Sequence, residues 1–185
     1  MVPGAKVLLL SERDKQLHLD AVHWGYAPGW WDKPPLINVR VETAATSRMF
    51  KPLWQQGRAI CFADGWFEWK REGDRKQLYF MHRKDGQPIF MAAIGSVPFE
   101  RGDESEGFLI MTAAADQGLV DIHDRRPLVL VPEAAREWMR QDIGGKEAGE
   151  IATDGSVSAD HFTWHPVSRA VSNVKNQSSH LIKPY

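Results

Sequence analysis

The sequence contains very little cysteine, because Cys61 is the only one among its 185 residues. A single cysteine cannot form an intramolecular disulfide, which suits a reducing compartment, so we expect a cytoplasmic protein. One cysteine and scattered histidines also make a structural zinc site unexpected, and we expect no metal or other cofactor. Cys61 lies in the apolar run 59–62, and we interpret it as a buried strand residue.

Long apolar runs and an excess of charge are also missing. No run approaches the roughly 20 residues that span a membrane, and residues 7–10 are too short for the apolar core of a signal peptide, so we expect no membrane partner. The net charge is -1, so a nucleic-acid site would have to come from a local basic patch. No Gly-x-Ser-x-Gly elbow, phosphate-binding loop or dinucleotide fingerprint occurs.

What the sequence does contain is a series of short strand patterns separated by turn signals. We expect strands at residues 6–10, 17–24, 36–41, 59–70, 78–82, 89–97, 108–112, 128–131 and 162–167. Gly65 is expected to bend the long strand, and Asp85-Gly86 is a hairpin signal.

Helix patterns are fewer. Residues 43–50 have a helical composition that should end before Pro52, and residues 132–142 and 146–152 predict two more helices. Residues 101–107 read as a polar surface loop. A chain that is 43% hydrophobic fits one globular domain over 1–185, and many strands with few helices predict a mainly antiparallel α+β fold.

Glu68 is the most informative residue, since it is the only glutamate in the aromatic run ADGWFEW at residues 63–69. A carboxylate near apolar rings loses hydration, which raises its pKa. A raised carboxyl pKa suits a proton shuttle that works near neutral pH. The alternative is a strand with one outward-facing glutamate between core aromatics, and the segment alone does not exclude it.

A second candidate segment is the polar run DIHDRRP at residues 121–127. His123 could move a proton, because histidine titrates near physiological pH. Arg125 and Arg126 could hold phosphates. The alternative is a polar loop with a structural histidine and a local ion cluster.

The run INVRVET at residues 37–43 is a third candidate. Strand alternation would put Asn38, Arg40 and Glu42 on one face. The amide can donate and accept hydrogen bonds, and the guanidinium can clamp a phosphate or pair with the carboxylate. The alternative is a solvated edge strand with an ordinary Arg–Glu pair.

Trp30 and Trp31 form the fourth candidate, because they lie in a loop rich in proline and glycine rather than in a periodic core pattern. Exposed loop aromatics can stack on unpaired bases, worth roughly 1–3 kcal/mol per base. The alternative is that both rings cap the core.

Taken together, these segments resemble the SRAP family (SOS response associated peptidase), the abasic-site processing proteins. The matching blocks are the Trp-Gly loop with its Pro-Gly-Trp, the Asn-x-Arg-x-Glu-Thr run, the Ala-Asp-Gly-Trp-Phe-Glu-Trp strand and the Ile-His-Asp-Arg-Arg-Pro loop. A fifth block, residues 165–174, resembles the end of the family's domain. The resemblance covers nearly the whole chain and implies a barrel-like, mainly antiparallel fold in a monomer.

The resemblance also implies a function. The family binds single-stranded DNA and crosslinks to abasic sites through an N-terminal cysteine, which is exposed by removal of the initiator methionine and forms a thiazolidine ring. Glu68 would shuttle protons, His123 would assist sugar ring opening and crosslink reversal, and Asn38 would orient the N-terminus and the sugar. The implied DNA-binding residues are Arg40, Trp30, Trp31 and Arg125. Such a protein would act at the nucleoid during DNA damage, without a cofactor.

The start of the chain departs from the family pattern. Residue 2 is Val, whereas the family begins Met-Cys-Gly-Arg and continues for a few dozen further residues. We therefore expect this chain to lack that segment and to form no thiazolidine, although an α-amine with a pKa near 7.7–8.0 could form a reversible imine. Cys61 cannot replace the missing residue, because ring closure needs the thiol and the α-amine on one residue.

Two other classes of function stay open. A non-catalytic single-stranded DNA-binding module would keep the recognition residues alone. A peptidase acting on separate substrates would need a nucleophile, and Cys61 is the only thiol available.

Overall fold

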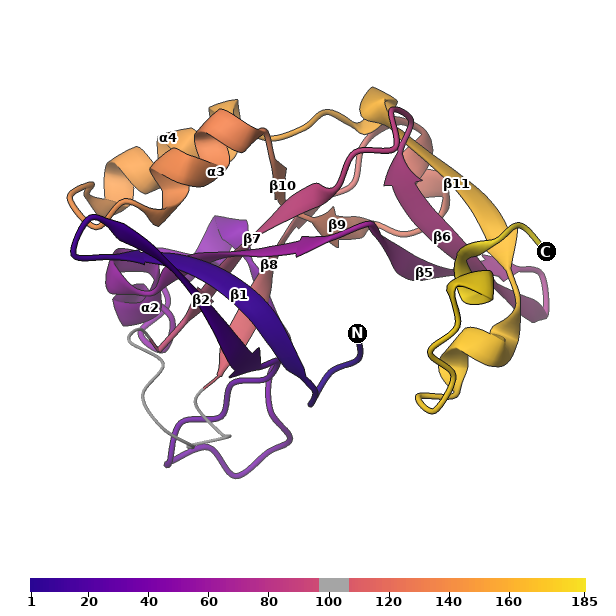
Figure 1. Ribbon diagram of the computed structural model, residues 1–185, viewed down its shortest axis with the longest axis horizontal. Helices are drawn as coiled ribbons and strands as arrows, with labels where there is room; N and C mark the ends of the chain where they lie inside the picture. Colours follow the sequence, from indigo (N-terminus) through magenta and orange to yellow (C-terminus); the bar gives the residue numbers. More distant parts are fainter. Residues whose placement is uncertain (97–106) are drawn as a thin grey trace. The chain divides into compact units, whose positions relative to one another are not determined.

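The computed structural model describes residues 1–96 and 107–185, so the expected loop at 101–107 lies outside the described residues except for Gly107. The chain divides into two compact units, and Figure 1 labels most of their helices and strands. The first unit contains Met1–Phe62, Phe90–Ala113 and Pro127–Val157, and the second contains Ala63–Ile89, Ala114–Arg126 and Ser158–Tyr185. The expected single domain over 1–185 stays a prediction.

The first unit is built on a mainly antiparallel sheet with the strand order β2-β1-β4-β7-β8-β3 and β10 beside β7. Strand β3 runs parallel to β8, whereas β1 pairs antiparallel with β2 and β4. Within the described residues the two edge strands, β2 and β3, do not pair, so the sheet is not a closed barrel. Its strands are β1 Lys6–Arg13, β2 Gln16–His23, β3 Asn38–Arg40, β4 Arg58–Ala63, β7 Ile89–Gly95, β8 Phe108–Ala114 and β10 Val129–Leu130.

In the part of this unit that the structure describes there are four helices: α1 Val41–Ala44, α2 Lys51–Gln56, α3 Pro132–Met139 and α4 Gly145–Asp154. Trp54 of α2 and Trp138 of α3 are buried and meet edge to face, with ring centroids 5.3 Å apart. Aromatic pairs prefer this arrangement over a face-to-face sandwich. None of the helices in the described part of the chain is long and apolar enough to cross a membrane.

Arg58, at the start of β4, is fully buried and ties two helix ends together. Its Nη1 donates to the carbonyl oxygens of Trp54 and Gln55, at 2.7 and 2.9 Å. Its Nε donates to Trp138 at 2.8 Å, and its Nη2 to Arg140 at 2.6 Å. The last carbonyls of a helix have no partner within the helix, so one guanidinium satisfies carbonyls at the ends of both α2 and α3.

The second unit is built on an antiparallel sheet with the order β11-β6-β5. Its strands are β5 Gly65–Glu72, β6 Arg75–Arg83 and β11 Phe162–Val167, and four 3-10 turns accompany them: η1 Gln117–Asp121, η2 Ala159–His161, η3 Arg169–Ser172 and η4 Ser179–Ile182. The short strand β9 Arg125–Pro127 lies at a boundary of the two units. A Cβ on Gly65 would lie 2.1 Å from the Met81 carbonyl oxygen. Only glycine therefore permits the close approach of β5 to β6.

The mainly antiparallel α+β fold is confirmed, and so is the strand at 162–167. The helix expected at 43–50 is wrong. Helix α1 ends at Ala44, and α2 begins at Lys51 after a turn in which the Ser47 carbonyl oxygen accepts from Lys51 N at 2.8 Å. Pro52 lies in the first turn of α2, where its missing N–H removes no helical hydrogen bond.

Candidate functional site

Glu68 lies in the middle of β5, opposite Tyr79 of β6. Side chains alternate along a strand, so Trp66 shares its face of the sheet while Phe67 and Trp69 point to the other. The carboxylate is half-buried, and its Oε1 accepts from the Trp69 N–H at 3.3 Å. Burial raises the pKa of Glu68, which is the predicted direction. The charge of His123 and the Trp69 N–H oppose that rise, and the charge of Asp124 adds to it.

His123 lies on a loop whose backbone is held at several points. Its N–H donates to the Leu119 carbonyl oxygen at 3.1 Å, and both Leu119 and Ile122 are buried. A Cβ on Gly118 would lie 2.8 Å from the Trp164 ring, so the loop packs tightly against β11. The Ala115 N–H donates to the Asp124 carbonyl oxygen at 2.9 Å. The loop therefore presents His123 from a fixed backbone.

Three groups surround the Nδ1 atom of His123. The Arg125 N–H donates to it at 3.0 Å, the Arg125 carbonyl oxygen lies 3.2 Å away, and Oδ1 of Asp124 also lies 3.2 Å away. The ring is 45% exposed, so solvent and ligands can reach it. His123 was a predicted site residue and Asp124 was not, although a carboxylate next to a histidine in the sequence is a signal that could have identified it.

The two neighbouring arginines differ in exposure. Arg125 is half-buried, whereas Arg126 is 6% exposed, with its guanidinium 5.8 Å from the Phe162 ring and 3.8 Å from an Asp116 oxygen. Burial lowers the pKa of Arg126, opposed by the charge of Asp116. Of the pair expected to hold phosphates, Arg126 is therefore packed into the fold.

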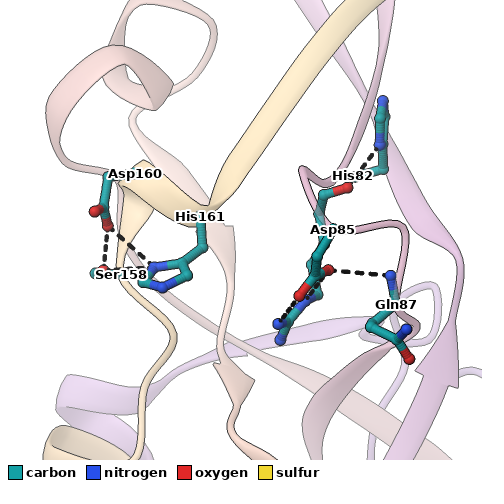
Figure 2. A network of polar contacts seen from close by, with 7 residues as sticks. His82, Asp85, Gln87, Ser158, Asp160 and His161 are labelled. Carbon is teal, nitrogen blue, oxygen red and sulfur yellow. Dashed lines mark hydrogen bonds and ion pairs between the residues drawn. The ribbon is translucent and has the colours of Figure 1, made fainter.

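Another histidine of the same unit also lies next to an aspartate. Figure 2 shows Ser158, Asp160 and His161, with the His161 Nδ1 atom 3.1 Å from Asp160 and 3.0 Å from the Ser158 hydroxyl. Ser158 also donates to the Asp160 carboxylate. All three residues are exposed and lie within four positions of the chain. This cluster is a local turn, so substitution of His161 is a suitable control for substitution of His123.

Asn38 and Arg40 lie in the first unit, on β3. Both are exposed on the same face of the strand, and the buried Val39 between them anchors it. Pairing with β8 also holds β3 in place, because Asn38 lies opposite Ile110 and Arg40 lies opposite Thr112. The expectation that Glu42 shares this face is wrong, because the chain turns into α1 at Val41.

Trp30 and Trp31 also lie in the first unit, on the loop between β2 and β3. The Trp30 side chain is 69% exposed, so it does not cap the core. Trp31 is half-buried, meets Trp30 edge to face at 6.0 Å, and donates from Nε1 to the Pro34 carbonyl oxygen at 3.0 Å. The loop thus presents one free aromatic face beside a second ring that is fixed.

Cys61 is fully buried on β4, as predicted. Its Sγ lies 3.9 Å from Sδ of Met1, and burial raises the pKa of the thiol to about 12. A thiol that does not ionise is a poor nucleophile. Among residues 1–96 and 107–185, no three His, Cys, Asp or Glu side chains are placed to hold a metal ion.

The second unit therefore brings Glu68, His123 and Asp124 within electrostatic range of one another. A half-buried carboxyl with a raised pKa beside an exposed imidazole can pass protons to and from a bound molecule. The exposed amide, guanidinium and indole groups of the first unit are groups that bind nucleic acid.

Comparison with known proteins identifies relatives along the whole chain. Residues 1–174 match the model of the family "SOS response associated peptidase (SRAP)". The chain is 81% identical over 184 residues to the abasic site processing protein YedK of Escherichia coli, covering 100% of this chain and 83% of that one. It is 27% identical over 192 residues to the abasic site processing protein HMCES of Xenopus tropicalis, covering 86% of this chain and 55% of that one.

Solved structures share the fold of this chain. A phage-related protein from Bordetella bronchiseptica matches with a TM-score of 0.80 and 34% identity, covering 91% of this chain and 81% of that one. A protein from Bacteroides thetaiotaomicron shares the fold, with a TM-score of 0.78 at 18% identity.

Proposed function

Because the chain belongs to the SOS response associated peptidase (SRAP) family, we propose that it processes abasic sites in single-stranded DNA. The relatives described above carry the name abasic site processing protein. The observation that carries the proposal for this chain is the placement of Glu68 beside His123, with burial raising the pKa of the carboxyl. The protein would act as a monomer on nucleoid DNA.

Glu68 and His123 would move protons in the covalent step. An abasic sugar reacts as its open-chain aldehyde, and an amine that attacks the aldehyde carbon expels water to give an imine. The carbinolamine oxygen must be protonated before it leaves, and a carboxyl whose pKa is raised by burial holds its proton to higher pH and can supply it. His123 would assist ring opening by proton transfer at the sugar oxygens.

The exposed residues of the first unit would hold the DNA. Arg40 and, from the second unit, Arg125 would contact phosphates. Trp30 and Trp31 would stack on bases next to the lesion. Asn38 would orient the sugar through its amide, which can both donate and accept hydrogen bonds.

Thiazolidine formation needs one residue that offers both an α-amine and a thiolate, since the sulfur adds to the imine carbon made by its own amine. Cys61 is not that residue, because its thiol is buried and lies within a strand. The same burial argues against a thiol peptidase that acts on separate substrates. For the described residues we therefore propose lesion binding and proton transfer, with no covalent role for Cys61.

The test uses a labelled single-stranded oligonucleotide with one abasic site and a matched intact oligonucleotide. A native gel measures binding to each, and a denaturing gel with and without borohydride detects covalent products, because borohydride reduces an imine to a stable amine. We expect tighter binding to the abasic strand and a denaturation-resistant band only with borohydride.

The other outcomes are equally informative. Equal binding to both oligonucleotides, with no trapped product, would replace the proposal with a non-catalytic single-stranded DNA-binding module, which the exposed Trp30 would also suit. A resistant band without borohydride would show that a stable crosslink forms, so that the covalent product would be more than a reversible imine.

A further inference from the structure

The loop around His123 offers its ring two competing hydrogen-bonding arrangements. The Arg125 N–H, 3.0 Å from Nδ1, can donate only to a nitrogen that carries a lone pair. The Arg125 carbonyl oxygen, 3.2 Å from Nδ1, can only accept from a nitrogen that carries a proton. The Asp124 carboxylate, at an ion-pair distance of 3.2 Å, favours a proton on the same nitrogen through its charge. Neighbours of opposite kind therefore compete for the same ring atom.

The outcome of this competition decides what Nε2 can do. If Nδ1 accepts from Arg125, the proton of the neutral ring lies on Nε2, which is then a donor and cannot take up a proton. If Nδ1 carries the proton and donates to the Arg125 carbonyl oxygen, with the Asp124 charge nearby, the lone pair lies on Nε2, which is then a base. Which nitrogen of a histidine is protonated is set by the hydrogen bond that the other makes.

We propose that Asp124 is a positioning residue that holds the proton of His123 on Nδ1 and so makes Nε2 the basic nitrogen. This inference rests on the proposed function, in which His123 moves a proton. Nδ1 has one carbonyl acceptor, one amide donor and the Asp124 carboxylate at ion-pair distance, all within 3.2 Å. The carboxylate is the only charged group of the three, and a negative charge at this distance stabilises a proton on Nδ1.

The loop backbone makes this arrangement persistent. The Ala115 N–H fixes the Asp124 carbonyl and the Leu119 carbonyl fixes the His123 amide, so the two side chains start from a fixed separation. Glu68, on β5, is the other ionisable group whose charge acts on this pair, and Asp124 favours its protonated form while His123 favours the ionised form. The charge of Asp124 therefore acts on both partners, since it adds to the rise that burial gives the pKa of Glu68 and favours a lone pair on Nε2 of His123.

The experiment reads the tautomer directly and needs no DNA. In a uniformly ¹⁵N-labelled protein, proton–nitrogen correlations across the imidazole at a pH where the ring is neutral distinguish the two nitrogens, because the one without a proton resonates far downfield. His123→Ala assigns the signals. The variants are Asp124→Asn, which can offer an amide N–H to Nδ1, Asp124→Glu, which keeps a carboxylate, and Asp121→Asn, which removes an exposed carboxylate of the same loop.

We expect mainly the Nδ1–H form in the wild type and in Asp121→Asn. Asp124→Asn should shift the tautomer ratio toward Nε2–H, the direction seen when an asparagine replaces the aspartate that orients a catalytic histidine, and Asp124→Glu should keep the wild-type form. A wild-type Nε2–H form, or a ratio unchanged in Asp124→Asn, would overturn the proposal. An equal shift in Asp121→Asn would also overturn it, since the effect would then be one of general charge.

A second readout links the tautomer to chemistry. The borohydride-trapped product with abasic DNA should form more slowly with Asp124→Asn and at the wild-type rate with Asp124→Glu. If the tautomer changes as expected but the wild type shows neither lesion binding nor trapped product, the proposed function fails while the assignment of Asp124 stands.

Discussion

Cys61 and Glu68 lie on consecutive strands of the chain, and burial raises the pKa of both, yet the two regions offer opposite chemistry. Cys61 is fully buried in an apolar strand. Burial raises the pKa of its thiol to about 12, so the thiol keeps its proton at neutral pH. Glu68 is half-buried and has an imidazole and a second carboxylate within electrostatic range. Complete burial in apolar surroundings gives a side chain that does not ionise, whereas partial burial beside charged partners gives a side chain that can exchange its proton.

The difference lies in which segments surround each residue. Cys61 is enclosed by its own sheet, with Leu9 of β1 as its neighbour in register. Glu68 faces a loop that comes from a distant part of the sequence and carries His123 and Asp124. A reactive carboxyl therefore requires a polar segment from elsewhere in the chain in addition to apolar surroundings.

The largest expected effect comes from removing the exchangeable proton. Glu68→Gln should lower the rate of borohydride-trapped product with abasic DNA by at least about 100-fold, because positioned acid–base groups typically contribute that much. Glu72→Gln is the matched control, since Glu72 is an exposed carboxylate on the same face of β5 and accepts from the Tyr79 hydroxyl at 2.6 Å. Equal rates in both variants would remove the distinction drawn between Glu68 and other carboxylates.

Removing the imidazole should have a smaller effect. His123→Ala is expected to lower the same rate by about tenfold, since the carboxyl would remain while one proton carrier is lost. His161→Ala should react like the wild type, because the cluster around His161 is a closed local turn. A loss of rate in His161→Ala that matched His123→Ala would point to a general effect of histidine removal.

Substitution of Cys61 tests whether its buried thiol contributes to stability but not to the chemistry. Cys61→Ser should destabilise the protein by about 1 kcal/mol, because a hydroxyl is more costly to bury than a thiol. It should leave lesion binding and the trapped product unchanged. Urea melts measure the stability, and the trapping assay measures the chemistry.

The same thiol should resist alkylation in the folded protein. Iodoacetamide is expected to react at Cys61 only as the chain unfolds, since the thiol is buried and its pKa is raised to about 12. Rapid alkylation under native conditions, detected by mass spectrometry, would show that the Cys61 thiol is accessible and reactive in the folded protein.

The smallest expected effect is a change in how stability depends on pH. A raised pKa in the folded state means that the folded chain holds the Glu68 proton more tightly than the unfolded chain, where the pKa is about 4.3. The resulting stabilisation is complete below that value and is lost as the pH rises through the folded pKa. Glu68→Gln, which cannot ionise, should therefore melt above the wild type at pH 8.

That difference in melting temperature should shrink as the pH falls toward 4, where the wild-type carboxyl is protonated in both states. Thermal melts of the two proteins from pH 4 to 8 give the comparison. A difference that grew toward acid would mean that the folded state favours the ionised carboxylate.

Local patterns predicted much of the fold. The strand at 162–167 matches β11 to the residue, and Pro132 marks the start of α3 as expected. The helix at 43–50 failed because helical composition does not reveal a turn, here the one through Ser47, and because Pro52 was taken as a stop when it lies in a first turn. The sheet was also expected to be barrel-like, and strand patterns say nothing about whether two edge strands meet.

In the candidate site, too, the sequence predicted the local features but not the contacts between distant segments. The aromatic neighbours of Glu68 indicated the direction of its pKa shift, because burial is partly a local property. The contacts of Asp124 with His123 depend on side-chain rotamers and on a loop held by Ala115 and Leu119, which sequence spacing does not report. The burial of Arg126 under Phe162 could not be read from two adjacent arginines for the same reason.

Arg58 has a consequence for how the first unit opens. Its guanidinium bonds to carbonyl oxygens near residues 54 and 138, so the ends of α2 and α3 are coupled although they lie far apart along the chain. Neither helix end can fray without leaving a buried cation short of acceptors, which is costly. Backbone amides in the last turns of α2 and α3 should therefore exchange their hydrogens for deuterium together, as one cooperative segment.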